Sequence, residues 1–279
     1  MTTPRPFAPT VRFMSSETTF GGTPASGPEV LASFGDRSAE FVGTDVSGAM
    51  ESLANACAVA FDVDSTVIRE EGIDVLADFL GKGEEVSAWT LKAMEGDTKF
   101  EDALAARLSI LRPSKSDIER CLDLRPLEIT PGIEELIDEL NRKGVDVYFV
   151  SGGFRIMIEP LARRLCVGRD NVVANTILFD SEGNYAGFDD SEPTSRDMGK
   201  ARALTMLKER HGYETMVMVG DGATDMQAKP PARSFVGYGG VAVRDAVRDG
   251  ACWFVTDFED ATRVVRDFGV RRRDDIDEE

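Results

Sequence analysis

Short apolar runs alternate with amphipathic segments from residue 58 onward. Residues 58–61 are apolar and lead directly into Asp-Val-Asp-Ser-Thr, which predicts a buried parallel strand followed by a loop. Residues 145–150 and 216–219 predict further strands, while residues 133–140 and 200–210 carry apolar positions at helical spacing. Alternation of strands and helices builds a doubly wound parallel sheet, so the sequence predicts an α/β fold.

One stretch between the predicted strands contains only helical periodicity. Residues 71–124 are too long for a simple crossover, so we expect them to form a helical cap inserted into the core. The α/β core is then expected at residues 51–70 and 125–262. Residues 1–50 are expected to be mostly a flexible leader that includes one short helix, and residues 263–279 a charged C-terminal tail.

The composition is that of a chain able to bury a core, since 42% of its 279 residues are hydrophobic and 29% are charged. The 32 Lys and Arg residues against 50 Asp and Glu residues give a formal net charge of −18. A protein this acidic repels nucleic-acid phosphates and anionic membranes, so neither is an expected partner. An anionic substrate would have to be met by a local cluster of cations or by a metal ion.

Cysteine spacing and the N-terminal residues bear on the compartment. The four cysteines contain no CxxC pair, which argues against a structural zinc site and favours a reducing environment. The first sixteen residues include Arg5 and Arg12 and no acidic residue, a pattern compatible both with an organelle transit peptide and with an ordinary disordered leader. We therefore expect a cytoplasmic protein, with a plastid as the alternative.

Polar residues of chemical interest follow three of the predicted strands. In an open α/β sheet, ligands bind outside the carboxyl ends of the strands, so these loops are expected to form one site. The residues are Asp62 and Asp64, then Ser151, Gly152 and Gly153, then Asp221, Thr224 and Asp225, with Lys200 ahead of the last loop.

The carboxylates of these loops are suited to a magnesium ion. Mg²⁺ prefers oxygen ligands and usually keeps several waters. Asp62 and Asp221 could supply side-chain oxygens, and the backbone carbonyl of Asp64 could supply a third. The sequence therefore predicts Mg²⁺ as a cofactor facing a phosphoryl group.

The same loops predict a route for phosphoryl transfer. Lys200, the Ser151 hydroxyl and the amides of Gly152 and Gly153 would neutralise the phosphoryl oxygens. Asp62 could then attack phosphorus to give an aspartyl-phosphate. Asp64 could protonate the leaving oxygen and later deprotonate the attacking water, and crowding by neighbouring carboxylates should favour its protonated form.

These motifs resemble a known family. The segment Phe61-Asp-Val-Asp-Ser-Thr66, the Ser151-Gly-Gly-Phe154 turn and Gly220-Asp-Gly-Ala-Thr-Asp225 are similar to those of the haloacid dehalogenase superfamily, and more narrowly of its phosphoserine phosphatases of the animal and plant type. The resemblance implies Asp62 as nucleophile, Asp64 as acid/base, and magnesium bound by Asp62, the Asp64 carbonyl and Asp221. It further implies that Asp225 supports the metal site, and that Thr224 belongs to the phosphate- or substrate-binding residues.

Substrate choice is expected to come from the cap. Phosphoserine carries a carboxylate and an ammonium group, and the resemblance places their recognition on Arg107 and Glu71, with Met94 and Phe100 as an apolar closing surface. One position departs from the family, because Glu95 follows the methionine where a small residue is expected.

The sequence thus predicts a Mg²⁺-dependent phosphatase for O-phospho-L-serine that catalyses the last step of L-serine synthesis. Two alternatives stay open: a phosphatase for another small phosphomonoester, and a catalytically silent phosphoserine-binding module. A homodimer is left open as well.

Overall fold

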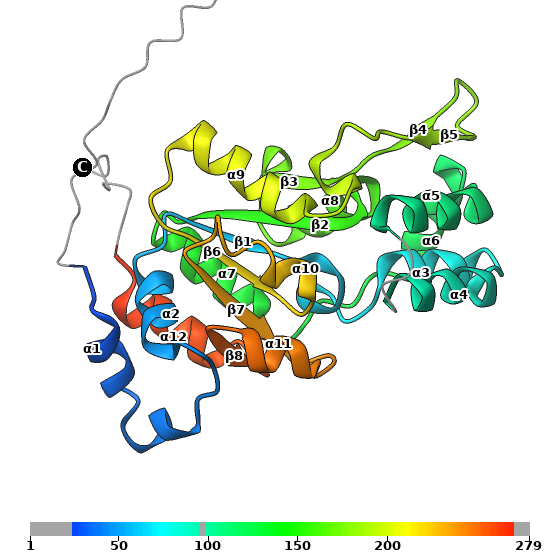
Figure 1. Ribbon diagram of the computed structural model, residues 1–279. Coiled ribbons are helices and arrows are strands. Elements are labelled where there is room, and N and C mark those ends of the chain that lie inside the picture. Colours follow the sequence, from blue (N-terminus) through cyan, green and yellow to red (C-terminus); the bar gives the residue numbers. More distant parts are fainter. Residues whose placement is uncertain (1–23, 95–98, 271–279) are drawn as a thin grey trace, which may run out of the picture.

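A computed structural model describes residues 24–94 and 99–270, without the side chains of residues 90–94. Its centre is a six-stranded parallel sheet with strand order β3-β2-β1-β6-β7-β8 (Figure 1). The strands are β1 Ala58–Phe61, β2 Asp146–Phe154, β3 Val172–Asn175, β6 Met216–Gly220, β7 Ser234–Tyr238 and β8 Trp253–Val255. Ala58 is in register with Asp146 on one side and with Met216 on the other. The α/β fold expected from the apolar runs is confirmed.

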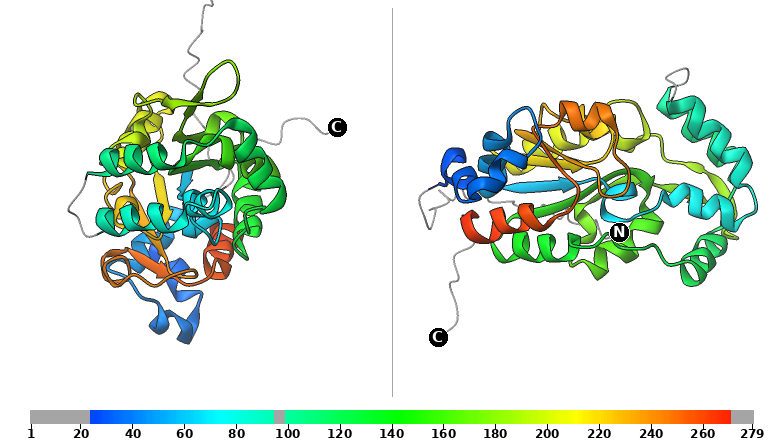
Figure 2. Two further views of the ribbon diagram at one scale, coloured as in Figure 1. Left: turned by 90° about the vertical axis from the view of Figure 1, so that its right-hand side faces the viewer. Right: turned by 90° about the horizontal axis from the view of Figure 1, so that it is seen from below.

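Helices cover both faces of the sheet, as Figure 2 shows. Alternate residues of β1 face opposite layers: Val59 and Phe61 belong to one apolar cluster, Ala58 and Ala60 to another. The first layer contains α2 Val46–Ala54, α7 Ile133–Arg142, α8 Arg155–Arg164 and α12 Glu259–Phe268. The second contains α9 Gly199–His211 and α11 Asp245–Gly250, with the short α10 Ala223–Met226 at the end of β6. Because the central strands are buried on both faces, they read as continuous apolar runs.

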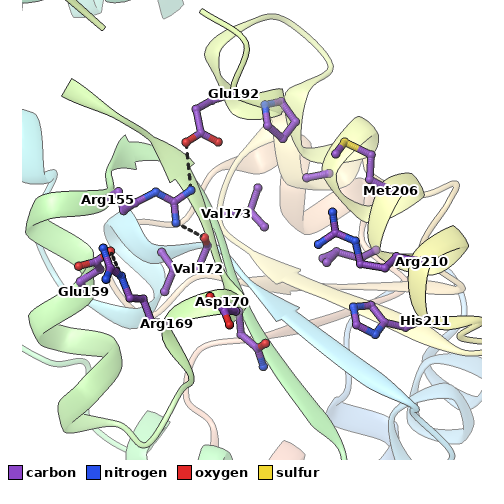
Figure 3. Close-up of a pocket in the computed structure, with 14 residues that line it drawn as sticks. Arg155, Glu159, Arg169, Asp170, Val172, Val173, Glu192, Met206, Arg210 and His211 are labelled. Atoms are coloured by element: carbon purple, nitrogen blue, oxygen red, sulfur yellow. Dashed lines mark hydrogen bonds and ion pairs between the residues drawn. The ribbon is translucent and has the colours of Figure 1, made fainter. Parts of the chain in front are cut away.

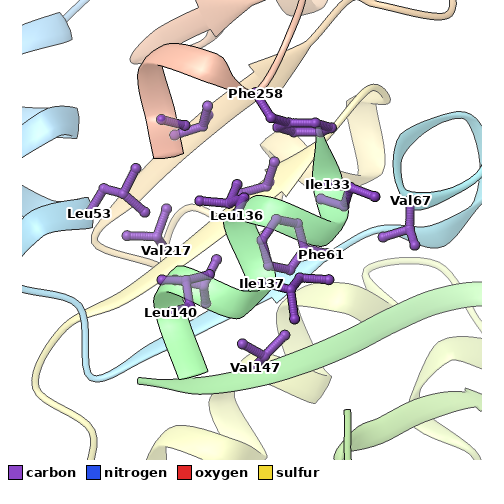
Figure 4. Close-up of a cluster of buried hydrophobic side chains, with 14 of the residues drawn as sticks. Leu53, Phe61, Val67, Ile133, Leu136, Ile137, Leu140, Val147, Val217 and Phe258 are labelled. Atoms are coloured by element: carbon purple, nitrogen blue, oxygen red, sulfur yellow. The ribbon is translucent and has the colours of Figure 1, made fainter. Parts of the chain in front are cut away.

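Helix α7 illustrates how the pattern becomes packing. Its buried positions Leu136, Ile137 and Leu140 form one stripe that packs against the sheet around Phe61 (Figure 4). Burying each such leucine or isoleucine stabilises the fold by roughly 1.5–3 kcal/mol. Gly144, at φ +70, follows the helix and allows the chain to turn directly into β2.

Four helices lie at one end of the sheet, where the strands end (Figure 1). They are α3 Gly72–Phe79, α4 Gly83–Met94, α5 Phe100–Leu111 and α6 Lys115–Leu124, and are called the cap below. The antiparallel hairpin of β4 Ile177–Phe179 and β5 Tyr185–Phe188 packs beside them. The backbone N–H of Lys115 donates to the carbonyl of Gly183 at 2.9 Å, which ties the cap to the tip of the hairpin.

The N-terminal and C-terminal boundaries differ from expectation. The predicted leader runs to residue 50, yet α1 Gly27–Ala32 and the short 3-10 helix η1 Gly35–Glu40 already belong to the folded part. Val30 and Phe34 are buried in the main core, and the ring of Phe34 meets that of Phe41 edge-on at 5.1 Å. At the other end α12 continues to Phe268, past the predicted tail boundary at residue 262, because Val264 and Val265 pack in the core.

Three further short helical segments complete the described part: η2 Val63–Val67, η3 Arg169–Asn171 and η4 Pro193–Ser195. Among the described residues, none of the helices combines the length and the apolar character needed to cross a bilayer.

Candidate active site

The loops after β1 and β6 bring three carboxylates together. Asp62, Asp221 and Asp225 are all buried, and each contributes an oxygen that lies within 4.8 Å of the oxygens of the other two. They meet although more than 150 residues separate Asp62 from Asp221, because β1 and β6 are neighbours in the sheet. Such a set of buried oxygen donors could hold a divalent cation.

The backbone after β1 orients the first carboxylate. The N–H of Asp62 donates to the carbonyl of Val219 on β6 at 2.9 Å, and the side chain of Asp62 accepts from the N–H of Val63 at 2.8 Å. The turn Val63–Val67 then reverses the chain, with Ser65 in the left-handed region at φ +53. This turn returns Ile68 to the main core beneath the site.

Lys200 forms ion pairs with two of the carboxylates. Its Nζ lies 2.7 Å from Asp62 Oδ1 and 2.6 Å from Asp225 Oδ1, and the lysine is buried at the start of α9. Burial alone would lower the pKa of Lys200, but the charges of Asp225 and Asp62 outweigh it and raise that pKa. Burial and the charge of Asp62 raise the pKa of Asp225 to about 7. The lysine is thus held as a cation between two acidic side chains.

Asp64 is held between the residues that follow β1 and Ser151 of β2. Its Oδ1 accepts from the N–H of Gly72 at 2.7 Å, and its Oδ2 accepts from the hydroxyl of Ser151 at 3.4 Å. Burial, followed by the charges of Glu71 and Asp62, raises the pKa of Asp64 to about 7. The direction agrees with the prediction of a protonated Asp64, but burial contributes more than the crowding by neighbouring carboxylates.

Ser151, Gly152 and Gly153, expected in a loop after the strand, lie within β2, where its pairing with β3 is irregular between Val150 and Phe154. The backbone of this segment is held from both sides. The N–H of Gly153 donates to Ser151 Oγ at 2.8 Å, so in this structure that amide orients the hydroxyl. The carbonyl of Gly152 accepts from Nδ2 of Asn175 at 2.8 Å, and Oδ1 of Asn175 accepts from the hydroxyl of Thr194 at 3.1 Å. A Cβ on Gly153 would approach Asp64 Oδ2 to 2.9 Å, so the close approach requires glycine.

Sequence reasoning missed three residues of this region. Asn175 ends β3 and Thr194 lies in η4, and both are buried. Arg244, after β7, donates to the backbone carbonyl of Asp221 at 2.9 Å and also pairs with its carboxylate. Asn175 has a position at the end of a strand that could have singled it out, whereas Arg244 carries no motif.

Three of the predicted substrate residues, Glu71, Arg107 and Phe100, interact with residues around this centre. Oε1 of Glu71 accepts from the Ser65 hydroxyl at 2.8 Å, and burial raises the pKa of Glu71. Burial lowers the pKa of Arg107, and the charges of Asp74, Glu71 and Asp64 oppose that shift, so the guanidinium faces the site carboxylates. Phe100 lies over the glycine segment of β2, because a Cβ on Gly152 would be 3.0 Å from its ring.

Three positions named in the sequence analysis remain. Thr224 is exposed on α10, next to Asp225. Met94 ends α4, but its side chain is outside the described part, and Glu95 is outside it altogether.

A cavity of about 700 Å³ lies elsewhere, along the outer edge of β3 between α8 and α9 (Figure 3). Arg155 crosses it, donating to the carbonyl of Val172 at 2.5 Å and to Glu192 at 3.1 Å. The guanidinium thereby covers backbone carbonyls of an edge strand. None of the predicted site residues lines this cavity.

The comparisons with known proteins agree with this geometry. A profile of the haloacid dehalogenase-like hydrolases matches residues 58–229. The chain is 51% identical over 204 residues to the chloroplastic phosphoserine phosphatase of Arabidopsis thaliana, covering 72% of this chain and 69% of that protein. It is 48% identical over 206 residues to the phosphoserine phosphatase of Rattus norvegicus, covering 74% of this chain and 92% of that protein. A solved structure of a substrate-bound phosphoserine phosphatase complex is 28% identical, with a TM-score of 0.65, covering 75% of this chain and 97% of that chain.

Proposed function

Since the chain belongs to the phosphoserine phosphatases of the haloacid dehalogenase-like hydrolase family, we propose that it hydrolyses O-phospho-L-serine to L-serine and phosphate. The observation that carries the proposal is the meeting of buried Asp62 and Lys200 with the half-buried Asp64 in one site. A carboxylate nucleophile, a carboxylic acid and a fixed cation are the groups that phosphoryl transfer through an aspartyl-phosphate requires.

In the first step, Asp62 attacks phosphorus, so that a carboxylate O–P bond forms while the ester O–P bond to serine breaks. Asp64 donates its proton to the departing serine oxygen. In the second step, Asp64 takes a proton from water, which attacks phosphorus and releases Asp62 and phosphate. Lys200 and the Ser151 hydroxyl bind phosphoryl oxygens, and the bond from Lys200 to Asp62 at 2.7 Å keeps the nucleophile oriented.

Magnesium is the proposed cofactor. The buried oxygens of Asp62, Asp221 and Asp225 suit a hard divalent cation, and the Asp64 carbonyl is proposed as a further ligand. When bound, the ion supplies positive charge that offsets the repulsion between a phosphate dianion and the carboxylates.

Selection of phosphoserine is proposed to depend on the cap. Arg107 would bind the substrate carboxylate, Glu71 its ammonium group, and Phe100 with Met94 would cover them. Glu71 is already oriented by its bond from Ser65. We further propose that residues 71–124 act as a lid that closes over residues 51–70 and 125–262 and excludes water during the reaction.

The test is phosphate release from a panel of phosphorylated metabolites, each with and without Mg²⁺. We expect the highest kcat/KM for phosphoserine and little release without Mg²⁺. Equal rates on phosphoserine and phosphoethanolamine, which lacks the carboxylate, would contradict selection by Arg107 and favour another small phosphomonoester. Mg²⁺-dependent binding without release would indicate a silent binding module.

For location, we propose the cytoplasm and a place at the end of L-serine synthesis. A plastid is the alternative, since the Arabidopsis relative is named chloroplastic. Expression of the full chain with a C-terminal fluorescent tag distinguishes the two.

A further inference from the structure

Lys229 and Cys252 meet away from the candidate active site. Lys229 follows α10 in the segment that leads to β7, and Cys252 comes directly before β8. Nζ of Lys229 lies 2.7 Å from Sγ of Cys252, although the residues are 23 positions apart. The cysteine therefore has a nitrogen nucleophile in direct contact with its sulfur.

The backbone on either side keeps the sulfur in this position. Cys252 is 2% exposed, its N–H donates to the carbonyl of Phe235 at 3.0 Å, and its carbonyl accepts from the N–H of Asp45 at 3.0 Å. Lys229, by contrast, is exposed. These bonds fix the backbone of Cys252, and the exposed Lys229 forms the solvent side of the pair.

The pair also favours the reactive form of the cysteine. Burial by itself raises the pKa of the Cys252 thiol, but hydrogen bonds from Lys229 and from the backbone N–H of Phe235 outweigh it, and the pKa is lowered. The thiolate is the form that reacts with peroxides, so a lowered value makes Cys252 more susceptible than a buried thiol without a cationic neighbour.

We propose that Lys229 and Cys252 form a site of reversible oxidative modification, at which hydrogen peroxide links Nζ to Sγ through a covalent S–N bond. Nothing in the proposed phosphatase reaction uses either residue.

The chemistry balances in two steps. The Cys252 thiolate attacks one oxygen of hydrogen peroxide, so that an S–O bond forms and the O–O bond breaks. The released hydroxide takes a proton from the Lys229 ammonium to become water, which leaves the amine unprotonated. Cysteine is thereby oxidised to the sulfenic acid and peroxide is reduced. The unprotonated Lys229 amine then attacks sulfur, the S–N bond forms, the S–O bond breaks, and the second water leaves with an amine proton. A dithiol reverses the link by attack on sulfur.

The link would restrain a chain segment next to the candidate active site, although neither linked residue belongs to that site. Lys229 lies four residues beyond Asp225, whose carboxylate holds Lys200. Joining this segment to the start of β8 closes a loop in the unfolded chain, so the linked protein should unfold at a higher temperature than the reduced protein. No side chain of the proposed reaction changes, so the linked protein should keep its turnover.

The test is mass spectrometry of the full chain, reduced and then treated with hydrogen peroxide. We expect a species lighter by about 2 Da, which dithiothreitol reverses, and a linked peptide pair containing Lys229 and Cys252 after digestion. Its Tm should rise by several degrees over the reduced protein.

Lys229→Arg is the matched variant, because arginine keeps the positive charge beside the sulfur but stays protonated and cannot attack it. This variant should instead stop at the sulfenic acid, about 16 Da heavier at Cys252, which dimedone traps. Cys166→Ser removes the exposed cysteine and should leave the link intact. The proposal is overturned if the wild type shows no linked peptide, if Lys229→Arg loses the same 2 Da at Cys252, or if Cys252 stays reduced while Cys166 is oxidised.

Discussion

Asn175 supports the irregular end of β2 that carries Ser151, and its replacement is the most specific mutational test of the site. The side chain is fully buried at the end of β3, where it donates to the Gly152 carbonyl and accepts from the Thr194 hydroxyl. Because the Gly153 N–H donates to Ser151 Oγ, the peptide between Gly152 and Gly153 is held at its carbonyl by Asn175 and at its N–H by Ser151.

Asn175→Ala removes the partner of two groups, the part-buried Gly152 carbonyl and the buried Thr194 hydroxyl. The buried hydroxyl alone costs about 1–3 kcal/mol, so the free energy of unfolding should fall by at least that amount. The freed peptide can tilt and move the Ser151 hydroxyl. Since a misplacement of about 1 Å can cost 10²-fold in rate, we expect kcat/KM for phosphoserine to fall by about 10- to 100-fold.

Both quantities are measurable on the same preparation, the first by urea unfolding and the second by phosphate release. Thr194→Val is the milder variant, because it leaves one unpaired group, Oδ1 of Asn175, and should cost about 1–3 kcal/mol. Asn171→Ala is the matched control: its Nδ2 donates to the Val147 carbonyl at 2.9 Å, outside the site. It should lower stability and leave kcat/KM unchanged.

If Asn175→Ala keeps the wild-type kcat/KM while its free energy of unfolding falls, Asn175 has only a structural role. Equal losses of kcat/KM in Asn175→Ala and Asn171→Ala would show that activity follows general stability, and the argument for this end of β2 would fail.

Three further outcomes are expected. Asp62→Asn should abolish phosphate release and leave the fold intact by circular dichroism; turnover near wild type would refute the nucleophile assignment. Arg107→Ala should reduce kcat/KM for phosphoserine far more than for an aryl phosphate, because only phosphoserine offers a carboxylate, and a parallel loss on both would instead indicate damage to the cap. Removal of Mg²⁺ with EDTA should suppress turnover, which added Mg²⁺ should restore; undiminished release in EDTA would argue against the metal.

The sheet and the three polar segments at its strand ends follow from local sequence, although the segment with Ser151 continues β2 and does not form a loop. Residues 58–61 and 216–219 are apolar throughout because both faces of their strands are covered, and such runs ending in acidic residues can be recognised without tertiary information. The sequence predicts Lys200 as a site residue only because it lies between the second and the third motif along the chain. The two bonds that hold it there depend on α9 lying against β2, which no local pattern encodes.

The residues that sequence reasoning missed act through tertiary contacts. Asn175 matters because β3 is next to β2, and Arg244 because the loop after β7 passes Asp221. In the sequence alone, neither this asparagine nor this arginine differs from an ordinary polar residue. The packing of the N-terminal segment is not predictable for a related reason: the apolar run that begins at Val30 is short and lies in a Ser- and Gly-rich stretch, and it is buried by packing on α2.

Charge connects the composition of the chain to the site. A protein of net charge −18 that handles a phosphate ester needs local cations, and the site supplies three, Lys200, Arg107 and Arg244. Each faces carboxylates already: Lys200 pairs with Asp62 and Asp225, Arg244 pairs with Asp221, and Arg107 faces Asp74 and Glu71. Protein cations alone therefore leave little positive charge for a phosphate dianion. Protons on the raised-pKa carboxyl groups of Asp64 and Asp225 and a divalent cation are two ways of neutralising the same cluster, and only the cation also attracts the phosphoryl oxygens.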